Sequence, residues 1–86
     1  MAPVTYRVVF AAGAASQYHD LPTGGQDALL QRAVELARAP WDATVLPPGD
    51  RAAFREAIFG EGRGLVDFYV DDESQTLRIF NLVWIG

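Results

Sequence analysis

The order of hydrophobic and polar positions along the chain predicts one strand, two helices and then three further strands. Alternation with a period of two is typical of half-buried strands, and it predicts strands at 4–10, 53–59, 65–70 and 76–85. Apolar residues at helical spacing predict helices at 11–20 and 26–38. A break is expected at 21–25, where a proline and two glycines follow Leu21.

Short connections join the last three strands, which favours an antiparallel meander. The segments 60–64 and 71–75 are glycine-rich and acidic turns that leave no room for a helix. The longer segment 40–52 contains Pro47 and Pro48 and is expected to be a loop. The predicted fold is therefore α+β with the order β-α-α-β-β-β, a helical hairpin packed on one face of a twisted antiparallel sheet.

Alternation also divides the strand side chains between the two faces of the sheet. The face expected to lie under the helices collects Tyr6, Val8, Phe10, Phe54, Ile58, Val66, Phe68, Val70, Leu77, Ile79 and Val83. The opposite, open face receives Arg7, Arg55, Asp67, Tyr69, Arg78, Phe80, Leu82 and Trp84. A slip of one residue or a bulge would invert the assignment of any strand.

The residues assigned to the open face carry two chemistries. Arg55, Arg78 and Tyr69 are candidates for a phosphate-binding or catalytic group, because guanidinium groups form forked hydrogen bonds with phosphate. Arg7, together with Arg63 in the turn at 60–64, is a candidate for contacts with nucleic acid. The second chemistry is an apolar stripe formed by Phe80, Leu82 and Trp84. This stripe needs a protein partner, a second copy of the chain or the loop at 40–52 to cover it.

The composition restricts the classes of function. The chain has 86 residues, of which 50% are hydrophobic, so a single globular domain over 1–86 is expected. The absence of cysteine and the single histidine, His19, exclude a disulfide framework and a thiolate metal site. The acidic run at 71–73 is interpreted as a hairpin turn. No metal or cofactor is therefore expected.

The charge of the chain argues against diffuse binding to nucleic acid. Seven basic residues, all arginine, face eleven acidic ones, for a formal net charge of −4. No apolar run approaches the roughly 20 residues of a membrane span, and the N-terminus does not have the pattern of a signal peptide. A cytoplasmic location without a membrane partner is expected.

Several segments in order give the chain a resemblance to a known family. These are Tyr6–Phe10, the alanine-rich segment to Pro22, the helix that ends in Leu36–Pro40, and the stretches 54–58, 65–73 and 77–80. In this order and spacing they resemble the RelE/ParE superfamily of toxins from type II toxin–antitoxin systems. The resemblance covers nearly the whole chain.

The resemblance implies a bacterial growth inhibitor that a cognate antitoxin holds silent. Members similar to RelE are mRNA interferases, metal-independent endonucleases that cut mRNA on the ribosome, whereas members similar to ParE inhibit DNA gyrase and are not nucleases. The ribosome and mRNA, or gyrase in the alternative, are therefore implied targets. A homodimer through the open face remains an alternative.

The transfer of family residues to this sequence is partial. Arg55 and Arg78 match positions where members of the family have a basic residue, and Tyr69 is a candidate acid–base or stacking residue. Val66 stands where the family usually has an arginine, and no basic residue or tyrosine follows Arg78. The resemblance thus implies an RNA endonuclease with an incomplete catalytic set, and a non-enzymatic gyrase inhibitor or an inactive protein-binding member is the alternative.

Overall fold

The computed structural model describes residues 5–49 and 51–86, which form two helices and a five-stranded sheet. The chain begins with β1 (Arg7–Phe10), α1 (Ala12–Asp20) and α2 (Thr23–Arg38). A short 3-10 helix, η1 (Pro40–Asp42), leads to β2 (Thr44–Val45). The strands β3 (Phe54–Phe59), β4 (Gly64–Asp71) and β5 (Thr76–Trp84) follow. Val4, which was assigned to the first strand, lies outside the described residues.

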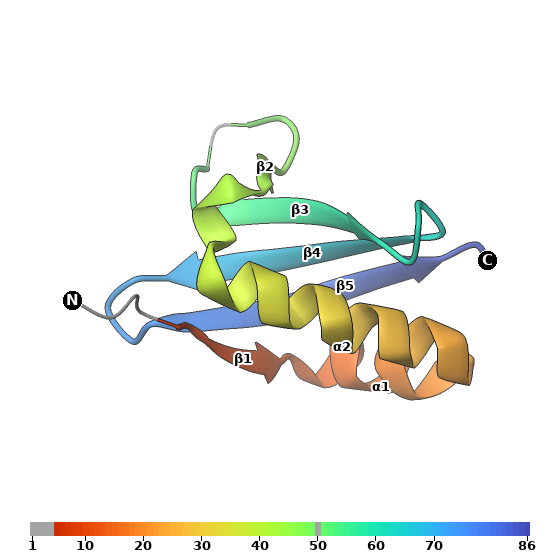
Figure 1. Ribbon diagram of the computed structural model, residues 1–86. Coiled ribbons are helices and arrows are strands. Elements are labelled where there is room, and N and C mark those ends of the chain that lie inside the picture. Colours follow the sequence, from red (N-terminus) through yellow and green to blue (C-terminus); the bar gives the residue numbers. More distant parts are fainter. Residues whose placement is uncertain (1–4, 50) are drawn as a thin grey trace.

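The two helices lie on one face of the sheet, as predicted (Figure 1). The strand order is β1-β5-β4-β3-β2, and β3, β4 and β5 form the predicted antiparallel meander. Two details differ from the expectation. β1 is parallel to β5, because the intervening chain provides the long crossover that parallel strands require. The loop at 40–52 also contributes β2, which pairs with β3 at the sheet edge.

The second helix begins earlier than its hydrophobic pattern predicts. α2 starts at Thr23, directly after Pro22, and so contains Gly24 and Gly25. Gly25 is buried, and a Cβ atom there would lie 3.3 Å from the indole of Trp84. The glycine therefore allows the last strand to approach the first turn of α2 closely.

The core lies between α2, α1 and the middle of the sheet. The buried side chains at its centre are Ala14, Leu29, Leu36, Ala57, Phe59, Val66, Phe68, Val70, Leu77, Ile79 and Leu82. Not all apolar residues at helical spacing in α2 face the core. Leu30 and Val34 remain 46% and 54% exposed. Both helices leave the opposite face of the sheet uncovered (Figure 1).

Candidate functional site

The uncovered face of the sheet, called here the open face, carries charged, aromatic and apolar side chains that lie outside the core. Directly paired residues of neighbouring strands share a face, so the strand registers assign each side chain. The open face carries Arg7 and Val9 of β1, Arg78, Phe80, Asn81 and Val83 of β5, Leu65, Asp67 and Tyr69 of β4, and Phe54, Glu56 and Ile58 of β3.

Three of the predicted site residues meet at one end of this face. Arg78 lies opposite Tyr69, and Arg7 lies opposite Thr76, two positions before Arg78. Together they line a cavity of about 510 Å³, which Asp71 also borders. Within residues 5–49 and 51–86, neither arginine forms a salt bridge. This end of the open face can therefore bind an anionic group.

Arg55 does not join these residues, so the prediction that Arg55 and Arg78 share the open face is wrong. Arg55 lies opposite Phe68, which is fully buried beneath the helices. Its Nε donates to the carbonyl of Ala52 at 2.7 Å, and its Nη1 donates to the carbonyls of Trp41 and Ala43 at 3.2 and 2.8 Å. The backbone of the 40–52 segment attracts this guanidinium to the helix side of the sheet.

Arg55 belongs to a polar cluster that fastens the segment after α2. Its guanidinium carbon lies 5.0 Å from the centre of the Trp41 ring, and the Trp41 indole donates to Asp72 at 3.2 Å. Tyr6 donates its hydroxyl proton to the same carboxylate. This hydrogen bond to Asp72 raises the pKa of Tyr6 above its ordinary value of 10.0, because it favours the protonated phenol. The cluster thus joins four distant segments and has a structural role.

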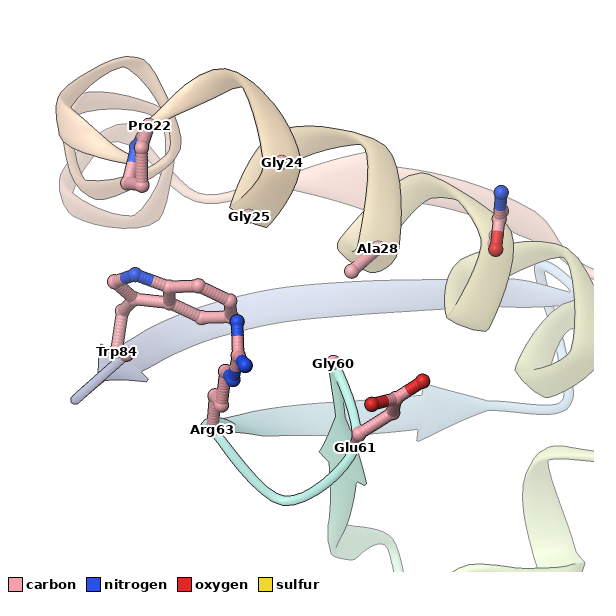
Figure 2. Close-up of a pocket in the computed structure, with 10 residues that line it drawn as sticks. Pro22, Gly24, Gly25, Ala28, Gly60, Glu61, Arg63 and Trp84 are labelled. Carbon is pink, nitrogen blue, oxygen red and sulfur yellow. The ribbon is translucent and has the colours of Figure 1, made fainter.

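The predicted apolar stripe of Phe80, Leu82 and Trp84 is also wrong, because only Phe80 lies on the open face. The pairing of β4 with β5 shifts between Asp67 and Phe68, so Phe80 is an extra residue in β5. This irregularity inverts the following positions. Leu82 therefore enters the core, where it is 5% exposed. Trp84 lies under the first turn of α2 (Figure 2).

Trp84 stacks on Phe59, with ring centres 5.7 Å apart, and Arg63 stands beside it (Figure 2). Arg63 and Trp84 line a cavity of about 520 Å³ at the end of the sheet that contains the β3–β4 turn. Arg7 and Arg78 lie near the other end, by the β4–β5 turn. The two arginines assigned to nucleic-acid contacts, Arg7 and Arg63, are therefore not brought together.

Phe54, Ile58 and Val83, which were assigned to the helix-covered face, lie on the open face. In β3 the buried positions are Ala57 and Phe59, because the ring of Phe59 occupies the space above Gly64. Phe54 packs edge-on against Tyr69 and Phe80, with ring centres 5.1 and 5.7 Å apart. These three rings form an aromatic cluster on the open face, between the end that carries Arg7 and Arg78 and the row of Glu56 and Asp67. The sequence alone does not select this phase of β3, since Glu56 charges one phase and Arg55 charges the other.

A chain of hydrogen bonds crosses the edge of the sheet to the open face. The Gln17 side chain accepts from the backbone N–H of Leu82 at 2.7 Å and donates to the Asn81 side chain at 3.1 Å. Asn81 then donates to Oδ2 of Asp67 at 3.1 Å. The second oxygen of Asp67, Oδ1, is buried and has no hydrogen-bond partner among the described residues. No hydrophobic or polar pattern in the sequence indicates the roles of Gln17 and Asn81.

Over the described part of the chain, no group of three or more histidine, aspartate and glutamate side chains is arranged to hold a metal ion. In the same part, no helix has the length and the apolar character needed to cross a membrane.

The chain is an α+β protein with a helical pair on one face of a mixed sheet, and solved structures with a similar fold are RelE toxins. The isolated RelE toxin of Escherichia coli is 14% identical, with a TM-score of 0.76 over 94% of this chain and 85% of that chain. A chain of the Mycobacterium tuberculosis RelBE2 toxin–antitoxin complex is 26% identical, with a TM-score of 0.80 over 94% and 92%.

The archaeal RelE–RelB complex from Pyrococcus horikoshii contains a chain that is 20% identical, with a TM-score of 0.70 over 95% of this chain and 97% of that chain. Neither a family model nor a curated protein matches the sequence. The resemblance to RelE toxins predicted from the sequence is thus confirmed by the structure, and the chain has a RelE-like toxin fold.

Proposed function

We propose that the chain is the toxin of a toxin–antitoxin module and that a separate antitoxin holds it inactive. The observation that carries this proposal is the RelE-like fold, which extends over 94% of the chain in the comparison with the M. tuberculosis protein. That protein and the P. horikoshii protein were both solved in complexes, described as toxin–antitoxin and RelE–RelB. A free strand edge and an apolar groove on this chain give an antitoxin a surface to bind.

The surface that we assign to the antitoxin lies between α2 and β1. β1 is at the edge of the sheet and pairs only with β5 among the described strands, so its outer edge can accept an added strand. A cavity of about 510 Å³ adjoins it, lined in part by Val8, Phe10, Leu30 and Val34. An extended segment followed by an amphipathic helix would cover both features.

Expression in a bacterial host tests whether the chain is a toxin that an antitoxin inactivates. Growth should stop when the chain is induced alone and resume when the adjacent small gene is expressed with it. The double variant Leu30→Glu, Val34→Glu should still stop growth but should no longer be rescued, because its groove repels apolar side chains. Gln31→Glu, exposed on the same helix, is the matched control. Normal growth under strong expression of the native chain would refute the toxin assignment.

For the activity, we propose that the toxin binds a protein target, with DNA gyrase as the first one to test, and does not cut RNA. The support is that Arg55 bonds to backbone carbonyls on the helix side. The centre of the open face instead carries Glu56 and Asp67 beside the exposed Ile58 and Val83. Carboxylates repel a phosphate backbone, whereas exposed apolar side chains suit a protein surface.

Ribosome-dependent mRNA cleavage is the second candidate, and the cavity shared by Arg7, Tyr69 and Arg78 favours it. The two activities separate in two assays with purified protein, inhibition of gyrase supercoiling and cleavage of mRNA on programmed ribosomes. Inhibition without cleavage is the expected result. Cleavage that Arg78→Ala abolishes, while Arg55→Ala leaves it intact, would establish the second candidate instead.

A further inference from the structure

Two carboxylates lie side by side at the centre of the open face without a cation between them. Glu56 of β3 is the direct cross-strand neighbour of Asp67 of β4, and like charges in this position repel each other. The described part of the chain has one salt bridge, Arg32 to Glu35, and it lies on α2. The nearest arginine along β5, Arg78, is separated from Asn81 by the irregularity at Phe80.

Asp67 is held in place but lacks one hydrogen bond. Its Oδ2 accepts from Asn81, which Gln17 fixes in turn. The residue is only 9% exposed, and its Oδ1 is buried without a partner in residues 5–49 and 51–86. A buried acceptor without a donor is unfavourable, and more so when it is charged. Because Oδ1 is closed off from solvent, Asp67 acts on another molecule through its negative charge and not through a direct hydrogen bond.

An apolar row borders the two acids. Ile58, Leu65 and Val83 lie in register across β3, β4 and β5, two positions beyond Glu56 and Asp67. Ile58 is 62% exposed and Val83 is 43% exposed. We call Glu56, Ile58, Leu65, Asp67 and Val83 together the acidic–apolar patch.

A cavity of about 350 Å³ opens beside the acidic–apolar patch, at the edge of β3 where β2 contributes Thr44. Its lining includes Glu56, Ile58 and Leu65 of the patch and adds a third carboxylate, Asp42. Its single cation, Arg32, already donates to the carbonyl of Ile58 at 3.0 Å and to Glu35 at 3.3 Å. The remaining charge at this edge of the sheet is therefore negative.

We propose that the acidic–apolar patch docks a protein segment in which a lysine or arginine is flanked by large apolar side chains. The basic group pairs with the carboxylate of Glu56 and offsets its repulsion from Asp67, while its neighbours cover Ile58 and Val83. RNA fits this surface poorly, because its backbone brings negative charge to two carboxylates. The inference deepens the proposed function, since it describes the segment of the protein target that the toxin recognises.

A peptide titration followed by two-dimensional NMR of the full chain tests this docking directly. The probe is acetyl-Leu-Arg-Leu-amide, and the control peptide replaces arginine by the isosteric, uncharged citrulline. The expected result is saturable shifts of the amides of the acidic–apolar patch with the arginine peptide and weaker binding of the citrulline peptide. Glu56→Gln should weaken binding of the arginine peptide by about two- to fivefold, the range of an exposed ion pair.

Glu73→Gln is the matched control variant, because Glu73 is exposed in the β4–β5 turn and loses the same charge away from the patch. It should bind like the native chain. Asp67→Asn should also weaken binding, but by less than Glu56→Gln, because Asp67 contributes only its charge, and its amide spectrum reports whether the variant is folded. If it unfolds, Glu56→Gln alone decides the test.

No saturable shift with the arginine peptide, equal binding of the citrulline peptide, or an unchanged affinity in Glu56→Gln would overturn the proposal. A single-stranded RNA oligonucleotide that shifts the same amides more strongly than the peptide would also overturn it. The toxin assignment is decided separately by growth arrest of cells expressing the native chain. A negative titration together with growth arrest would thus refute only the docking surface.

Discussion

The two faces of the sheet differ in what determines their side chains. Under the helices, Val66, Phe68 and Ile79 fill a closed core in which each is fully buried. On the open face, arginines, aromatic rings, carboxylates and exposed apolar side chains lie in separate zones along the strands. Packing explains the first face completely but not the second. The open face is therefore where the function of the chain is expected.

The largest test of this difference compares two phenylalanines on opposite faces. Phe68→Ala should lower the free energy of unfolding by about 3–5 kcal/mol, because it leaves a cavity in a closed core. Phe80→Ala should cost less than about 2 kcal/mol, since its ring is half-buried on the open face. Urea denaturation followed by circular dichroism measures both values. Equal losses would show that something covers the open face.

The second comparison concerns the two arginines on opposite sides of the sheet. Arg55→Ala should destabilise the chain by about 1.5–3 kcal/mol, because three carbonyls lose a charged donor. Arg78→Ala should change the free energy of unfolding by less than about 0.5 kcal/mol, as is usual for an exposed residue. The same urea denaturation measures the change in the free energy of unfolding for both variants. A larger loss in Arg78→Ala would reverse the roles given to the two residues.

A smaller loss of stability is expected at the edge of the sheet, where the Gln17 side chain hydrogen-bonds to the backbone of β5. Gln17→Ala should cost about 1 kcal/mol, because the N–H of Leu82 loses its acceptor and Asn81 loses a donor. Hydrogen exchange should speed up at Leu82, while Gln26→Ala, another glutamine with a hydrogen bond to the backbone, should leave this amide protected. Unchanged exchange at Leu82 in Gln17→Ala would contradict the hydrogen bond.

The smallest expected effect is a dependence of stability on alkaline pH. The pKa of Tyr6 is raised in the folded chain, so its stabilising contribution is complete below pH 10.0, the ordinary value, and is lost as the pH rises through the folded pKa. The native chain should therefore lose more stability above pH 10 than Tyr6→Phe, which lacks this phenol and its hydrogen bond to Asp72. Thermal melting between pH 8 and 11 measures the difference, and parallel curves would contradict it.

The layered fold was predictable from the sequence because long periodic segments determine it. Alternation placed Val66, Phe68 and Val70 correctly on the covered face, and the last strand was predicted almost to its ends. The parallel partner of β1 was not predictable, since nothing local distinguishes it from an antiparallel one. The short β2 likewise has too few residues to show a period.

The candidate site was predicted only in part, because tertiary contacts decide which phase of a strand is buried. In β3 both phases contain two apolar residues, and the space above Gly64 selects Ala57 and Phe59. In β5 the irregularity at Phe80 reverses the face on which each later residue lies, and no residue type in the sequence predicts it. Arg7, Tyr69 and Arg78 were placed correctly because their strand segments precede the irregularity or do not contain one.

The central claim is that the open face acts on the target, whereas Arg55 contributes only to stability. Growth arrest on induced expression tests it with two variants whose folded fraction in the cell is measured by pulse proteolysis. Arg55→Ala should stop growth in proportion to the folded protein present. Ile58→Lys, which changes the open face, should not stop growth even when the protein is folded. Growth arrest by folded Ile58→Lys but not by folded Arg55→Ala would contradict the account.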